Sequence, residues 1–140
     1  MWYTFNTNKG GLMKLTDAKV SWVRERVAKY CEALEVPPPT FLILTRKGYE
    51  EWKGWRKEIN SSYRGRNFSR FLGVCHGNYK LERFGMITLN VKKHDDLKGL
   101  DNTIRHELIH WAKPSYNHRS QEFHDRMNKL LKGDIKNGRF

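Results

Sequence analysis

The sequence has little cysteine, few acidic residues beside its many basic ones, and no long apolar run. Its two cysteines, Cys31 and Cys75, are too few for a disulfide framework and are not spaced as a CxxC zinc knuckle. We expect both to be ordinary buried thiols, as free cysteines usually are. The scarcity of cysteine therefore argues against a disulfide scaffold and against a cysteine-rich zinc ribbon.

No segment approaches the roughly eighteen continuous apolar residues that a membrane-spanning helix needs. The first residues, "MWYTF", lack the basic start and the apolar stretch of a signal peptide. We therefore expect an intracellular protein of the cytoplasm, nucleoid or nucleus that is neither secreted nor bound to a membrane. No coiled-coil pattern is present, and we expect a monomer.

The shortage of acidic residues leaves a strongly basic chain, because 27 Lys and Arg stand against 15 Asp and Glu and give a net charge of +12. Such a charge favours polyanionic partners, with nucleic acid first and an acidic membrane surface second. Hydrophobic residues make up 38% of the chain and aromatic residues 13%, which is enough for a packed core. A length of 140 residues fits one domain.

Apolar residues at helical spacing predict a first helix from the N-cap at Thr16 to Leu34, and a run of three prolines ends the pattern. Strands are predicted near residues 40–45, 71–75 and 85–91, and further helices near 101–113 and 120–133. The stretch 46–70 has the least regular pattern. The expected fold is α+β, with a small, mostly antiparallel sheet packed against the N-terminal, central and C-terminal helices. We expect residues 1–14 to form an arm and residues 15–140 to form the domain.

The segment "TIRHELIHWAKPSYNHRSQEFH", residues 103–124, holds four of the six histidines. Its His106-Glu107-Leu108-Ile109-His110 matches HExxH, and on a helix His106 and His110 point the same way and can hold one Zn²⁺. Ile104, Leu108 and Trp111 occupy another face and can anchor that helix to the core. Glu107 stands beside the first ligand, where it can act as the general base toward a zinc-activated water.

A catalytic zinc site needs a third protein ligand, for which His118, Glu122 and His124 are candidates. His118 lies in the loop before Ser120, where its side chain can turn back toward the first two ligands. His124 stands on the flank of the last helix and is the second choice, and Glu122 is expected to face solvent. We therefore predict His106, His110 and His118 as the metal ligands, with His124 as the alternative.

Four segments together resemble the SprT-like zinc metalloprotease family, which includes the Spartan proteases that digest proteins crosslinked to DNA. The resemblance spans about residues 15–131 and is carried by "FLGVCHGNY", "RFGMITLNV", "LDNTIRHELIHW" and "SQEFHDRM". It implies a minimal zincin-type metalloprotease domain with Zn²⁺ on His106 and His110 and with Glu107 as the catalytic base. The family's third ligand is a histidine shortly before the "EF" helix, and His118 is its nearest match, followed here by Arg119 where the family usually has Gly.

The resemblance also implies a DNA partner, although the chain has no cysteines for the C-terminal zinc ribbon that many members carry. We expect DNA contacts, single-stranded DNA included, from an interleaved set of basic and aromatic residues, in which cations neutralise phosphates and rings stack on bases. This set consists of Trp52, Lys53, Trp55, Arg56, Lys57, Tyr63, Arg64, Arg66 and Arg70.

The expected function is therefore a zinc endopeptidase acting on DNA-bound or DNA-crosslinked proteins, with the peptide paired to the sheet edge at "MITLNV". Two alternatives stay open. One is a general minimal zincin peptidase without a DNA role, and the other is a DNA-binding or anti-restriction module with a structural zinc. Glu107 favours an enzyme, because a structural metal site needs no base beside it.

Overall fold

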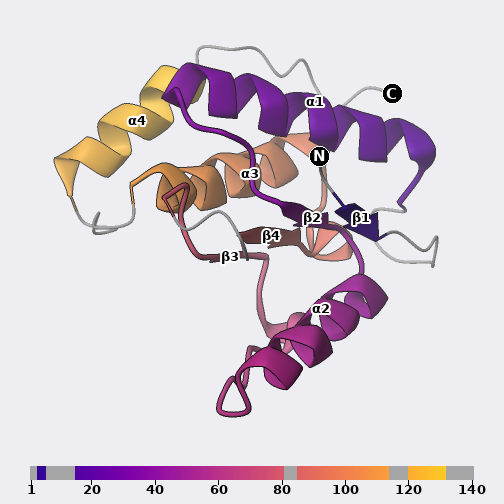
Figure 1. Cartoon of the computed structure of the whole chain (residues 1–140). Coiled ribbons are helices and arrows are strands. Elements are labelled where there is room, and N and C mark those ends of the chain that lie inside the picture. Colours follow the sequence, from indigo (N-terminus) through magenta and orange to yellow (C-terminus); the bar gives the residue numbers. More distant parts are fainter. Residues whose placement is uncertain (1–2, 6–14, 81–84, 114–119, 132–140) are drawn as a thin grey trace.

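A computed structural model of the chain describes residues 3–5, 15–80, 85–113 and 120–131, and it has helices on both faces of one small sheet (Figure 1). Helices α1 (Asp17–Leu34) and α3 (Leu97–Ala112) lie on one face, and α2 (Arg46–Ile59) lies on the other. Helix α4 (Gln121–Leu131) packs against α3. This arrangement confirms a mixed α and β domain.

Each helix begins at a side-chain cap that the sequence supplies. The hydroxyls of Thr16 and Thr45 accept the N–H groups of the third residues of α1 and α2, and Asp96 does the same for Gly99 of α3 at 2.8 Å. Ser120 accepts the N–H of Phe123 at 3.3 Å and starts α4 as predicted. Helix α3 begins one turn earlier than the expected start near residue 101, because Asp96 is its N-cap.

The sheet contains β1 (Tyr3–Phe5), β2 (Phe41–Ile43), β3 (Gly73–His76) and β4 (Met86–Leu89) in the order β1-β2-β4-β3. Strands β1 and β2 are parallel, β2 and β4 are parallel, and only β3 and β4 are antiparallel. The expectation of a mostly antiparallel sheet was therefore wrong. The connection through α2 enters β3 at the end of the sheet where β2 finishes, and β3 carries the chain back so that β4 can run parallel to β2.

Helix α2 was not predicted, because residues 46–70 were expected to be the least regular part of the chain, and strand β1 of the expected arm was not predicted either. The buried side chains of α2, Tyr49 and Trp52, lie three residues apart and face the sheet. Two 3₁₀ turns, η1 (Phe68–Arg70) and η3 (Val91–Lys93), complete the connections to β3 and α3. The basic and aromatic stretch is therefore a packed layer of the domain.

Alternate side chains of the strands serve two separate cores. Leu42, Ile87 and Leu89 pack with the apolar faces of α1, α3 and α4. Ile43 and Met86 point the other way and pack with Tyr49, Trp52, Phe68 and Phe71. This alternation follows the two-residue repeat of a strand, and it places α2 and α3 on opposite faces of the sheet.

A buried polar network fixes α3 against α1. The Asp101 carboxylate accepts a short hydrogen bond from the Tyr30 hydroxyl and lies 2.7 Å from Arg105 Nε and 3.7 Å from Arg26 Nε. At the other end of α3, Trp111 Nε1 donates to the Pro37 carbonyl at 2.7 Å. Both contacts hold the helix that carries the HExxH residues.

Among the helices of the described ranges, none combines the length and the apolar character needed to cross a membrane.

Candidate active site

His106 and His110 lie side by side on α3. Their ring centroids are 4.9 Å apart with an interplanar angle of 70°, and both side chains are half-buried. Ile104, Leu108 and Trp111 are all fully buried on the other side of the helix, which confirms the predicted anchoring face. The two imidazoles therefore converge as the HExxH spacing predicts, and together they could hold one metal ion such as Zn²⁺.

Helix α4 contributes an aromatic wall to this site. The Phe123 ring lies 5.2 Å from the His106 ring at an angle of 81° and is 8% exposed. An ion pair between Glu122 and Lys113 also joins α4 to the end of α3. The "EF" segment of the sequence is thus brought to the histidines as expected.

The third metal ligand stays a prediction. His118 falls outside the described residues, and for His124 the structure describes the helical backbone but not the side chain. Glu122 is exposed and pairs with Lys113, in line with the expectation that it faces solvent. Within the described part of the chain, no third histidine, cysteine or carboxylate joins His106 and His110 in one group.

Glu107, the residue after His106, is buried with 8% of its surface exposed. Burial raises the pKa of its carboxyl group to about 7, and the positive charge of Arg66 opposes this shift. Its side chain lies against β3, because a β-carbon built on Gly73 would be 3.1 Å from Glu107 Cγ. Burial, and secondarily the charge of Glu107, raises the pKa of the Cys75 thiol on the same strand.

Strand β3 is the edge of the sheet next to this carboxylate, since within the described residues it pairs only with β4. The segment "MITLNV" was expected to be the edge, but β4 has β2 on one side and β3 on the other, so its backbone groups are already used. A groove of about 550 Å³ runs between residues 62–66 and residues 74–76 of β3. The open strand is therefore β3, and the groove lies along it.

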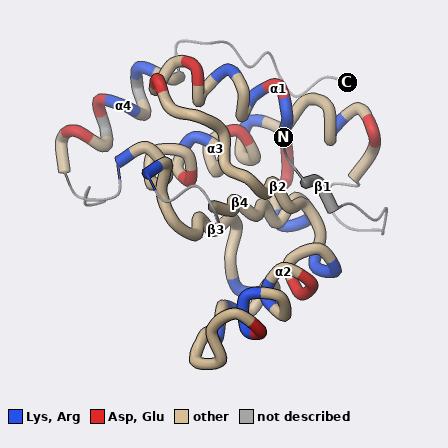
Figure 2. The backbone as a smooth tube through the Cα atoms, viewed as in Figure 1, with Lys and Arg blue, Asp and Glu red and all other residues tan. Residues whose placement is uncertain are grey.

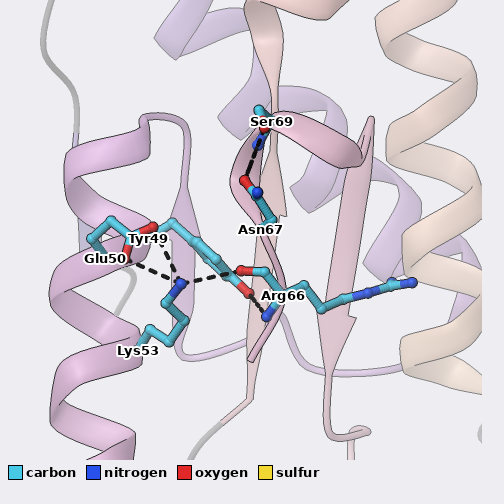
Figure 3. Close-up of polar contacts among 6 residues, drawn as sticks. All are labelled: Tyr49, Glu50, Lys53, Arg66, Asn67 and Ser69. Carbon is cyan, nitrogen blue, oxygen red and sulfur yellow. Dashed lines mark hydrogen bonds and ion pairs between the residues drawn. The ribbon is translucent and has the colours of Figure 1, made fainter. Parts of the chain in front are cut away.

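Hydrogen bonds between the Arg66 backbone and two side chains of α2 hold the far wall of the groove in place (Figure 3). The Arg66 N–H donates to the Tyr49 hydroxyl at 3.0 Å, and its carbonyl accepts from Lys53 Nζ at 3.1 Å. Lys53 is itself paired with Glu50 at 3.1 Å. Gly65 precedes this point with a φ of +68°, a left-handed conformation that favours glycine.

Two of the predicted DNA-binding aromatic residues are packing residues. Trp52 is 2% exposed and contacts the rings of Tyr63 and His76 at 5.7 and 4.9 Å. A stacking role for Trp52 on an unpaired base is therefore wrong, because its ring faces the core. Tyr63 is half-buried, and burial raises its pKa to about 12.

The remaining members of that set lie nearer the surface, and Figure 2 shows basic positions along α2. Trp55 is 37% exposed, with its ring 5.6 Å from that of Phe41. Lys53 and Arg56 are half-buried, and the exposed cations are Lys57, Arg64, Arg66 and Arg70. The structure thus keeps a basic surface on α2 and on the chain that follows it.

From the sequence, Arg66 was assigned only to DNA and Gly73 had no role, although the Arg66 charge acts on Glu107 and Gly73 lies against its side chain. No local pattern marks either residue, because the sheet brings them to α3 from distant parts of the chain. No family model, curated protein or solved structure matches the chain.

Proposed function

We propose that the chain is a zinc-dependent endopeptidase of the SprT-like type that cleaves DNA-bound or DNA-crosslinked proteins. The observation that carries the proposal is the position of Glu107. This carboxylate is buried on the helix that carries the two converging imidazoles, and its side chain lies against Gly73 of the open edge strand β3. A structural metal site needs neither the buried carboxylate nor the edge strand, whereas a peptidase needs both.

Zn²⁺, when bound by His106, His110 and the predicted third ligand, supplies a Lewis acid that activates water and polarises a carbonyl. Glu107 would accept a proton from the attacking water and deliver it to the leaving nitrogen. Its burial excludes bulk water, so the proton it takes up is kept for the leaving group. Phe123 packs on His106 and limits the orientations of that ring.

The substrate would lie extended in the groove and pair its backbone with β3. Such pairing uses backbone N–H and C=O groups, which are common to all peptides, so the enzyme would select little by sequence. An extended strand also requires the substrate to be locally unfolded. Selectivity would then come from holding the enzyme close to its target.

DNA supplies that proximity in our proposal. The whole-chain charge of +12 and the exposed cations of α2 and the following segment support phosphate binding. Trp55, at 37% exposure, is the ring of this set that is most open to a base. The cations supply most of the expected affinity, and binding should weaken steeply with added salt.

The experiment is cleavage of a basic DNA-binding protein by the zinc-loaded chain, with and without a single-stranded oligonucleotide. Glu107→Gln and a chelated sample serve as controls. Cleavage that DNA stimulates and that both controls lose supports the proposal. Cleavage at the same rate with and without DNA would favour a general zincin peptidase. Zinc binding without cleavage would favour a DNA-binding or anti-restriction module.

A further inference from the structure

Arg66 combines a hydrogen-bonded backbone with an exposed side chain that makes no hydrogen bond or ion pair to another described residue. Its N–H and C=O are held by Tyr49 and Lys53 at 3.0 and 3.1 Å. Over the described ranges its guanidinium makes no hydrogen bond and no ion pair, although the side chain is exposed. Two hydrogen bonds therefore fix the point of the backbone from which the Arg66 side chain starts.

From that point the Arg66 side chain leaves α2. Figure 3 shows the Arg66 side chain extending away from α2 and its hydrogen-bonded neighbours. Its positive charge acts on Glu107 and lowers the pKa of that carboxyl group, against the larger rise that burial causes. Among the described residues it is the charged side chain with this effect. Within the described ranges the two groups form no ion pair within 4 Å.

A peptide in the groove would lie beside Arg66 and along the strand that the Glu107 side chain touches. Residues 62–66 and 74–76 line the groove on its two sides, and Gly73 brings Glu107 against the start of β3. A peptide paired with β3 would therefore lie in the groove that Arg66 lines. Its carbonyl groups point alternately toward β3 and toward the opposite wall, where Arg66 stands.

We propose that Arg66 binds the carbonyl oxygen of the scissile bond and stabilises the negative charge that develops on it. This inference rests on the proposed peptidase function and assigns one further catalytic residue to it. A guanidinium suits the task because it stays protonated and offers a fork of N–H donors to one oxygen. Donors aimed at a developing oxyanion are among the largest contributions to enzymatic rate.

The step balances without a further reactant. The water oxygen forms a bond to the carbonyl carbon, and the water proton passes to Glu107. The carbonyl oxygen becomes negative and is held by Arg66. The C–N bond then breaks, Glu107 gives its proton to the nitrogen, and the products are a carboxylic acid and an amine. Arg66 keeps all its protons throughout.

The first test uses short peptides taken from the cleavage sites that the wild-type chain makes in β-casein, assayed without DNA. Arg66→Ala should lower kcat about 100-fold and change KM less than about threefold, as removal of an oxyanion donor does. Arg66→Lys should recover part of the loss, since it keeps the charge but not the fork. Lys98→Ala, which removes one exposed charge from α3, is the control and should leave kcat unchanged.

The second test measures binding and needs no turnover. A phosphinic analogue of the same peptide carries a charged tetrahedral oxygen in place of the carbonyl oxygen, as the transition state does. Arg66→Ala should weaken its binding by roughly the factor lost in kcat. The same substitution in a Glu107→Gln background should leave binding of the uncut peptide within about threefold. Zinc content is measured for each variant and should not change.

The outcomes separate this inference from the function on which it rests. If the wild-type chain cleaves neither β-casein nor a DNA-bound protein, the peptidase function fails and the role of Arg66 fails with it. If the wild type cleaves but Arg66→Ala matches Lys98→Ala, only the role of Arg66 is overturned. A loss confined to KM, or unchanged binding of the phosphinic peptide, would likewise overturn it.

Discussion

Gly73 of β3 lies directly against Glu107 of α3, with no room for a side chain between them. A β-carbon at Gly73 would be 2.7 Å from Thr103 Cγ2 and 3.1 Å from Glu107 Cγ. The first distance is too short for two carbon atoms and the second is tight, so the side chains of Thr103 and Glu107 would both have to shift. The close approach of β3 to α3, and with it the position of the proposed base beside the groove, therefore depends on this glycine.

Gly73→Ala should accordingly harm activity more than stability. We expect a loss of stability of about 1 to 3 kcal/mol, as in other overpacked sites. The displacement of Glu107 should lower kcat by about 10- to 100-fold. Gly54→Ala is the matched control, because a β-carbon there meets nothing within 4 Å and alanine favours the middle of α2. Urea unfolding measures the stability of both variants, and peptide cleavage measures their kcat. Equal activity in the two would show that the position of Glu107 does not depend on Gly73.

The burial of Glu107 should cost stability in the metal-free protein. Its pKa of about 7 lies above the value near 4.3 of an unfolded chain, so the folded state binds the extra proton between these values. Stability therefore falls as the pH rises from about 4.3 to about 7, and the full cost is present above 7.

Glu107→Gln removes this cost. In the presence of a chelator at pH 8 the variant should be more stable than the wild type by roughly 2 to 3 kcal/mol. The gain should shrink as the pH is lowered to 5, and denaturant unfolding at several pH values measures it. A gain that stays constant with pH would mean that Glu107 is not held in a buried, protonated form.

His94 should give the opposite pH dependence. Its Nδ1 donates to the Asn90 carbonyl at 2.9 Å, and its Nε2 lies 2.8 Å from the Thr103 hydroxyl. Burial lowers the pKa of this imidazole, so near pH 6.5 the unfolded chain takes up a proton that the folded chain refuses. Stability from His94 is therefore complete above about pH 6.5 and is lost below it.

His94→Gln should be less stable than the wild type at pH 8, and the difference should narrow by pH 5. Thermal unfolding of the two chelated proteins across this range is the measurement. A difference that widens toward low pH would show that the His94 ring is charged in the folded state.

Asp101 should be the most sensitive charged residue for stability. Its carboxylate is 1% exposed and holds the equally buried Arg105 at 2.7 Å, next to His106. Asp101→Asn leaves the Arg105 charge buried without its counter-ion, which typically costs 3 to 5 kcal/mol. Glu122→Gln breaks an exposed ion pair instead and should leave the unfolding midpoint unchanged. If both variants unfold alike, the network does not anchor α3.

The elements that local patterns specify were predictable from the sequence. Thr16 caps a helix with apolar residues at regular spacing, and His106 and His110 share one face because they are four residues apart. Helix α2 was missed because Gly48 and Gly54 weaken its pattern. Thr45 and the spacing of Tyr49 and Trp52 were nevertheless a signal for it.

Features set by strand pairing could not be predicted in the same way. The parallel alignment of β2 with β4, and hence the position of β3 at the edge, depends on how the connections cross the sheet. Arg66 and Gly73 reach Glu107 only through that arrangement. Trp52 was assigned to DNA because the residues around it in the sequence are rich in basic and aromatic side chains, as in a nucleic-acid-binding surface. Its ring instead belongs to the core.

The most direct test of the account is zinc titration of the metal-free chain, followed by cleavage of β-casein and by calorimetry. We expect the activity to rise as zinc is added and to stop rising near one zinc ion per chain. We also expect Glu107→Gln to bind zinc equally well and to cleave nothing. Full cleavage by Glu107→Gln, or the absence of stoichiometric zinc binding in the wild type, would contradict the account.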